Sequence, residues 1–177
     1  MALKQAANQL GFQSKTGIEV DWEESVGLVG DETWADRGRG WAEPGSVPWI
    51  PEDMASASIG QSVVQITPLQ LARAYAVFAN GGWLVTPHLA SGGVDWLAPE
   101  HRRRVDLNPS TLQTIREGLR KVVSDGTGFG LNGPGIPPAA GKTGTAEDST
   151  GGPDHAWFGS YAPCLLYTSD AADETGR

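Results

Sequence analysis

Residues 67–86 read TPLQLARAYAVFANGGWLVT and contain the local signals for a helix followed by a strand. Thr67 supplies a side-chain acceptor at the N-cap, Pro68 occupies the first helical position, and Gln70 completes a capping box. Apolar side chains then recur at i, i+3, i+4 and i+7 on one face: Leu71, Ala74, Tyr75 and Phe78. The segment therefore predicts an amphipathic helix, which ends at an Asn-Gly-Gly stop before the short apolar run that predicts the strand.

The remaining elements are placed outward from this segment. Asn108-Pro109 predicts the start of a second helix that ends near Ser124-Asp125-Gly126. Residues 140–146 and 155–162 predict two strands that pair antiparallel. The N-terminal part predicts a helix over residues 2–10, a strand over 16–20, and a long irregular excursion over 21–53 that carries Trp22, Trp34, Trp41 and Trp49. Helices and strands are grouped rather than alternating, so we expect an α+β fold, an antiparallel sheet with flanking helices.

Composition limits the classes of partner and cofactor. The 177 residues include 24 Gly and 12 Pro, yet 39% are hydrophobic and seven are Trp, which indicates one packed domain interrupted by loops. The formal charge of −8 argues against a nucleic-acid partner, and we interpret Arg102, Arg103 and Arg104 as a solvated loop. With only Cys164, and no zinc spacing among His88, His101 and His155, the sequence predicts no metal and no cofactor.

The segment Gly141-Lys142-Thr143-Gly144-Thr145 carries the most informative chemistry. A phosphate-binding loop needs an upstream glycine where Ile136 stands, and it needs the N–H groups that Pro137 and Pro138 lack. A second interpretation is an edge strand that presents a cation and hydroxyls to an anionic, peptide-like ligand. A third is a lysine that only protects a sheet edge from aggregation. The last two interpretations stay open on this segment alone.

Several blocks in the same order resemble the transpeptidase domain of penicillin-binding proteins, and most closely its class B branch. They are Thr16-Gly17-Ile18, Ser58-Ile59-Gly60-Gln61, Thr67 to Ala72, Ala79 to Gly82, Gly141 to Thr145, and His155 to Phe158 followed by Tyr161-Ala162-Pro163. The joint order of these blocks is far more specific than a Lys-Thr-Gly triplet. The resemblance implies a serine β-lactamase-like fold.

The resemblance also implies roles for four residues. Lys142 and Thr143 would hold the terminal carboxylate of a D-alanyl-D-alanine stem peptide or a β-lactam, and Gly144 would leave room for it. The backbone N–H of Thr145 would be one of two oxyanion-hole donors. The implied reaction is acyl transfer through a serine ester, with no cofactor, in bacterial cell-wall cross-linking.

The family's nucleophile motif, S-x-x-K, is absent from this chain. Its four lysines are Lys4, Lys15, Lys121 and Lys142, and three residues before them stand Met1, Phe12, Gly118 and Ala139. No S-x-N triplet is present either. We therefore expect residues 1–163 to be the C-terminal portion of a transpeptidase domain, inactive alone, and residues 164–177 to be a non-native or disordered tail.

The resemblance places the parent protein at the bacterial cytoplasmic membrane, with this domain extracytoplasmic and a membrane glycosyltransferase as partner. No anchor or signal is seen in this sequence. An alternative from another class is a non-catalytic scaffold module that binds a peptide or partner protein through the same groove or the Trp-rich segment.

Overall fold

The computed structural model describes residues 2–20, 23–30, 50–61, 64–90, 92–131, 133, 135–147 and 152–163. Its helices are α1 (Ala2–Gln9), α2 (Pro51–Ser58), α3 (Pro68–Ala79) and α4 (Pro109–Ser124), with 3-10 turns η1 (Pro99–His101) and η2 (Phe129–Leu131). Its strands are β1 (Leu28–Val29), β2 (Val64–Gln65), β3 (Trp83–Val85), β4 (Arg102–Arg104), β5 (Ala140–Ala146) and β6 (His155–Tyr161). The prediction of an irregular excursion over 21–53 is wrong where the structure describes that segment. Leu28–Val29 form β1, and α2 begins at Pro51, where the Asp53 carboxylate accepts from the Ile50 N–H at 3.1 Å. The rest of the excursion and all of the predicted tail at 164–177 lie outside the described residues.

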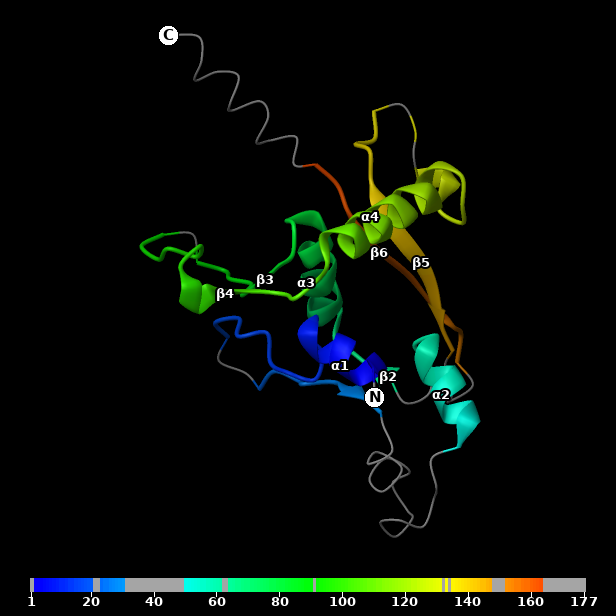
Figure 1. Cartoon of the computed structure of the whole chain (residues 1–177), viewed down its shortest axis with the longest axis horizontal. Helices are drawn as coiled ribbons and strands as arrows, with labels where there is room; N and C mark the ends of the chain where they lie inside the picture. The colour runs from blue at the N-terminus through cyan, green and yellow to red at the C-terminus, as the bar shows by residue number, and fades with distance from the viewer. Residues whose placement is uncertain are drawn as a thin grey trace.

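The strands form three antiparallel pairs, β1–β2, β3–β4 and β5–β6. The longest pair, β5–β6, aligns Lys142 with Gly159 and Gly144 with Trp157. Helices α3 and α4 pack against this hairpin, and α2 lies beside the C-terminal end of β5 (Figure 1). The α+β prediction is therefore confirmed, and so are both main helices and the antiparallel hairpin.

Helix α3 is positioned by the predicted capping box. The Thr67 hydroxyl accepts from the Gln70 N–H at 3.1 Å, and the Gln70 side chain accepts from the Thr67 N–H at 3.0 Å. Gln70 is only 1% exposed, and its amide also donates to the carbonyls of Ser14 and Val26, both at 2.9 Å. One side chain thus caps α3 and holds two distant segments against it.

The central apolar cluster joins α3 to β3. Val77, Leu84 and Val105 are almost completely buried, and Leu10 and Leu107 pack against them. Gly11 follows α1 with φ +85°, and a Cβ there would come within 2.9 Å of Leu84 Cδ2. Glycine is therefore required by both the backbone conformation and the close approach of the core.

The predicted strand at 16–20 is wrong. The Thr16 N–H donates to both carboxylate oxygens of Glu24, at 2.8 and 2.9 Å, and the Gly17 N–H donates to one of them at 3.3 Å. A carboxylate therefore takes the place that a neighbouring strand would occupy. Burial is the largest single effect on the Glu24 carboxyl, and it raises the pKa. Hydrogen bonds from Thr16 and Gly17 together outweigh it, so the pKa of Glu24 is lowered overall.

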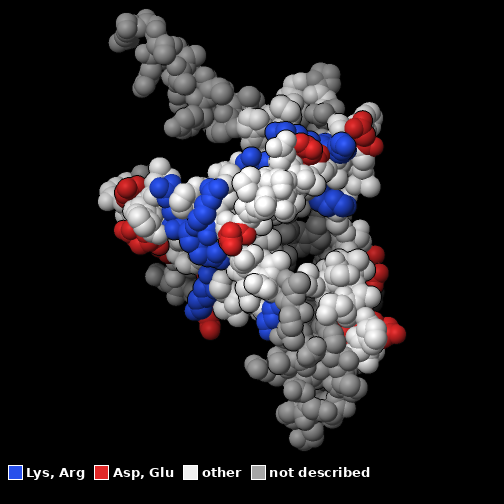
Figure 2. All heavy atoms as spheres, in the orientation of Figure 1, with Lys and Arg blue, Asp and Glu red and all other residues white. Residues whose placement is uncertain are grey.

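Arg103 and Arg104 are exposed, as predicted, but the prediction that the three arginines form a loop is wrong. They form β4, which pairs with β3. Arg102 and Arg104 lie over the Trp83 ring, 4.6 and 5.4 Å from its centroid, and Arg103 donates to the Asn8 and Gln9 carbonyls at the end of α1. Each of the three cations thus has a cation–π or helix-capping contact within the protein. Figure 2 shows basic side chains gathered at the left of the view, over the part of the molecule where Figure 1 draws β3 and β4.

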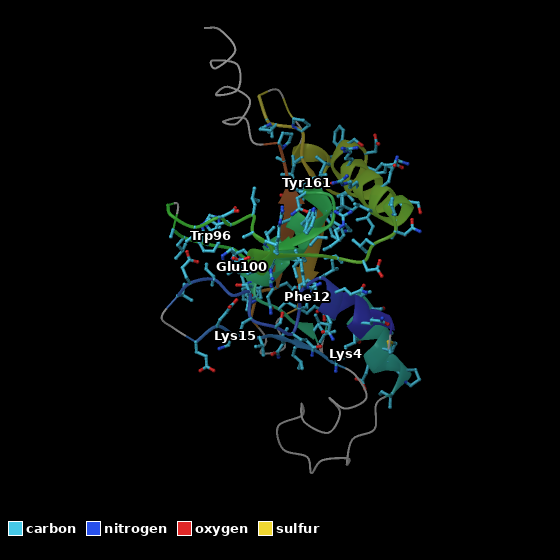
Figure 3. The ribbon with its side chains drawn as sticks, turned by 60° about the vertical axis from the view of Figure 1, so that its left-hand side comes forward. Lys4, Phe12, Lys15, Trp96, Glu100 and Tyr161 are labelled. Carbon is cyan, nitrogen blue, oxygen red and sulfur yellow. The ribbon has the colours of Figure 1, made fainter. Side chains whose placement is uncertain are left out.

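The loop between β3 and β4 projects away from the hairpin. Trp96 stacks on His88 with ring centroids 4.2 Å apart, and His101 lies 4.7 Å from the same ring. Figure 3 shows Trp96 at the outer end of this loop, while Tyr161 lies at the end of β6.

Among the described residues no helix has the length and apolar character that crossing a membrane requires.

Candidate functional site

A groove of about 480 Å³ opens beside the β5–β6 hairpin. All four residues that the sequence predicted as site residues line it: Lys142, Thr143, Gly144 and Thr145. Its other walls come from the residues after α2, from β2 and the residues that follow it, from α3, from the end of β5 and from β6. They are Ile59, Gly60, Val64, Gln65, Ile66, Thr67, Leu71, Tyr75, Ala146, Trp157 and Gly159. The groove therefore combines an apolar wall with a polar strand that carries one cation.

Lys142 presents its ammonium at the rim of this groove. The side chain is exposed, and Nζ donates to the Thr143 carbonyl at 2.9 Å and to Thr143 Oγ1 at 3.4 Å. An ammonium has three donors, and water-exposed hydrogen bonds to neutral oxygens exchange readily for a charge-assisted bond to an anion. The cation and the neighbouring hydroxyl are thus already together at one point of the strand.

Thr143 has a second hydroxyl contact that the sequence did not predict. Its Oγ1 lies 2.7 Å from Oγ1 of Thr127, which follows the end of α4. The two residues are sixteen positions apart, so no local pattern predicts their contact. The available signal was the pair of glycines at 126 and 128, which marks a tight turn after a helix.

The edge of β5 that faces away from β6 is contacted by a residue that follows α2. Gln61 Nε2 donates to the Thr145 carbonyl at 3.0 Å, across 84 positions of sequence. In an antiparallel strand the N–H and C=O of one residue point to the same side. The Thr145 N–H is therefore directed to the same edge as Gln61, away from β6.

Gly144 and Gly159 of this hairpin differ in how much space a side chain would have at each position. A Cβ at Gly144 would meet only Trp157 Cβ, at an ordinary 3.7 Å. A Cβ at Gly159 would lie 2.5 Å from Tyr75 Cζ and 2.9 Å from its hydroxyl oxygen. Gly159 is thus required for α3 to pack on the hairpin, and that burial raises the pKa of Tyr75. Gly144 has no such local requirement, and it leaves the groove side of the strand open.

Other chemistries suggested by single residues are not supported by the geometry. The Gly141 to Thr145 segment is a strand that continues to Ala146, whereas a phosphate-binding loop must lead into a helix. His155 begins β6 and is exposed. Within the described ranges, no group of three or more His, Cys, Asp or Glu side chains is placed to hold a metal ion.

Comparison with known proteins gives consistent matches. The profile of the family described as "Penicillin binding protein transpeptidase domain" matches residues 1–164. The peptidoglycan D,D-transpeptidase MrdA of Acinetobacter baumannii is 35% identical over 151 residues, which cover 82% of this chain and 21% of that protein. MrdA of Haemophilus influenzae is 31% identical over 175 residues, covering 86% and 26%. The chain thus spans about a quarter or less of these relatives' length.

Solved structures match over most of the chain. A structure titled "Structural coordination of polymerization and crosslinking by a peptidoglycan synthase complex" aligns with a TM-score of 0.70 and 38% identity, over 90% of this chain and 26% of that one. The imipenem acyl-enzyme complex of penicillin-binding protein A from M. tuberculosis aligns with a TM-score of 0.65 and 27% identity, over 92% and 34%.

Proposed function

Because this chain belongs to the penicillin-binding transpeptidase family, we propose that its groove binds the carboxylate end of a peptidoglycan stem peptide ending in D-alanyl-D-alanine, and β-lactams that resemble it. The observation that carries this proposal is the joint position of the Lys142 ammonium and the Thr143 hydroxyl at one point of a groove. A carboxylate is acceptor-only and binds best where several donors converge.

The neighbouring backbone supports the same proposal. Gly144 leaves the groove side of β5 open, so a peptide is able to approach the strand closely. The Thr145 N–H faces the same edge, where a peptide carbonyl would lie if the ligand added alongside the strand. That N–H is the one we propose as an oxyanion-hole donor.

We infer that this chain holds an acyl donor without forming the serine ester. Acyl transfer requires an activated nucleophile, and the S-x-x-K motif that would supply it is absent from the sequence. Incubation with a fluorescent penicillin is therefore expected to give no label that survives denaturation. A covalent adduct on this chain would contradict this part of the proposal.

Calorimetric titration with a diacetylated L-Lys-D-Ala-D-Ala peptide tests the binding site itself. Lys142→Gln should weaken binding about 10- to 100-fold, because it removes a charge-assisted hydrogen bond. Lys121→Gln is the matched control, since Lys121 is an exposed lysine on α4 outside the groove lining. Equal affinity for the unaltered chain and the Lys142→Gln variant would refute the proposed role of Lys142.

The scaffold alternative uses the same groove, and the absence of S-x-x-K favours it. The two functions differ in ligand selectivity. A transpeptidase groove discriminates against a peptide whose terminal carboxylate is amidated, whereas a general scaffold that recognises peptide side chains does not.

For a whole protein containing this chain, we propose a location at the outer face of the cytoplasmic membrane and a glycosyltransferase partner. The similarity to a protein solved as a peptidoglycan synthase complex supports that partner.

A further inference from the structure

The turn after α4 is built so that it presents one side chain, Thr127, to β5. The Asp125 N–H donates to the Lys121 carbonyl at 2.9 Å, and the Gly128 N–H donates back to the Val122 carbonyl at 2.9 Å. A Cβ at Gly126 would lie 2.9 Å from Val122 Cα and 3.0 Å from its carbonyl oxygen. The tight return of the chain thus excludes a side chain at 126 and leaves the threonine at 127 to reach the strand.

The hydroxyl of Thr127 completes a short chain of polar groups. Thr143 Oγ1 lies 2.7 Å from Thr127 Oγ1 and 3.4 Å from Lys142 Nζ. A hydroxyl has one donor hydrogen and two acceptor sites, whereas an ammonium only donates. Thr143 therefore accepts from Lys142. If Thr127 also donates to it, both acceptor sites are filled and the Thr143 hydrogen must point elsewhere.

We propose that Thr127 is a positioning residue that holds the Thr143 side chain in one rotamer and directs the Thr143 hydroxyl hydrogen into the groove, toward the carboxylate of a bound peptide. The inference rests on the proposed function for the identity of the ligand, but the effect on the rotamer does not depend on any ligand. Thr127 is not among the residues that line the groove, so it acts through Thr143.

The direct test is the rotamer of Thr143 in the ligand-free full chain, measured from three-bond couplings to its Cγ2 carbon by NMR. In the unaltered chain we expect a single rotamer. Thr127→Val keeps the shape but removes the hydroxyl, so the couplings should become averaged over rotamers. Thr127→Ser keeps the hydroxyl and should restore the single rotamer. Thr114→Val is the matched control, because the Thr114 hydroxyl donates to the Ser110 carbonyl within α4.

Binding of the L-Lys-D-Ala-D-Ala peptide is the second measurement. Thr127→Val should weaken binding of the free-carboxylate peptide about tenfold, the effect of one lost hydrogen bond, and weaken binding of the amidated peptide less, because its neutral oxygen accepts a weaker hydrogen bond. Thr127→Ser should stay within about twofold of the unaltered chain.

Three outcomes would overturn the inference. In the first, the couplings of Thr143 are unchanged in Thr127→Val. In the second, both Thr127 variants lose the dispersed amide spectrum together, which would make the threonine a structural cap alone. In the third, the Val and Ser variants have averaged couplings alike. If the unaltered chain binds neither peptide, the proposed function fails, and the couplings alone still decide the role of Thr127.

Discussion

Replacing Gln70 with methionine is expected to lower the free energy of unfolding by about 3 to 5 kcal/mol. The side chain is buried, and its amide oxygen and nitrogen hold three backbone groups: the N–H of Thr67 and the carbonyls of Ser14 and Val26. Methionine has nearly the same length and volume, so it removes the hydrogen bonds without leaving a large cavity.

The magnitude follows from those three contacts. Each intramolecular hydrogen bond contributes about 1 kcal/mol net, which gives about 3 kcal/mol for the set. Counted instead by the backbone groups left without a partner, the loss is about 1 to 3 kcal/mol for each fully buried group. These three bonds are only partly buried, so the total stays near the lower end, at about 3 to 5 kcal/mol. The full loss is a large fraction of the roughly 5 to 15 kcal/mol that keeps a typical domain folded.

Urea unfolding followed by circular dichroism measures the change. Gln113→Met is the matched control, because Gln113 is an exposed glutamine whose side chain makes one hydrogen bond, to Glu117 on the same helix. It should change the stability by less than about 0.5 kcal/mol. A Gln70→Met variant as stable as the Gln113→Met variant would refute the argument that Gln70 joins α3 to the N-terminal segments.

Two further perturbations test the Glu24 contacts of the N-terminal segment and the packing of α3 on the hairpin. Glu24 has a pKa below its ordinary 4.5, so its contribution to stability is present above that pH and is lost as pH falls through the lowered value. Glu24→Gln should remove this loss of stability at low pH. Hydrogen exchange at the Thr16 and Gly17 amides, followed as a function of pH, measures the change, and the same pH profile in the variant would contradict the role of the Glu24 carboxylate. Gly159→Ala should force Tyr75 away from the hairpin and weaken peptide binding. Adding Tyr75→Ala to that variant should partly restore peptide binding. Full binding by Gly159→Ala alone would show that the contact between Gly159 and Tyr75 is not tight.

Local signals in the sequence were sufficient for α1, α3, α4 and the hairpin, but α2 was not predicted. Thr67 and Gln70 make the capping box that the spacing predicted, and Asn108 accepts from the Ser110 N–H at the start of α4. Such signals succeed because a cap involves residues within one turn of each other. The same locality allowed β5 and β6 to be predicted from short runs bounded by glycine and proline.

What sequence reasoning missed depends on contacts between distant residues. Nothing near position 16 predicts that the Glu24 carboxylate would occupy its N–H group, and nothing near Arg103 predicts a contact with the end of α1. The contacts of Gln61 with Thr145 and of Thr127 with Thr143 likewise form only when separate elements pack together. The four predicted site residues were brought to one groove, but their binding roles remain proposals.

The most direct measurement of the central claim is the set of intermolecular nuclear Overhauser effects between the bound L-Lys-D-Ala-D-Ala peptide and this chain. We expect contacts from the terminal D-alanine methyl group to Gly144 and to the Trp157 ring, which lie opposite each other in the β5–β6 register and both line the groove. Contacts confined to another surface, such as the arginines of β4, would contradict the claim that this groove receives the peptide's carboxylate end.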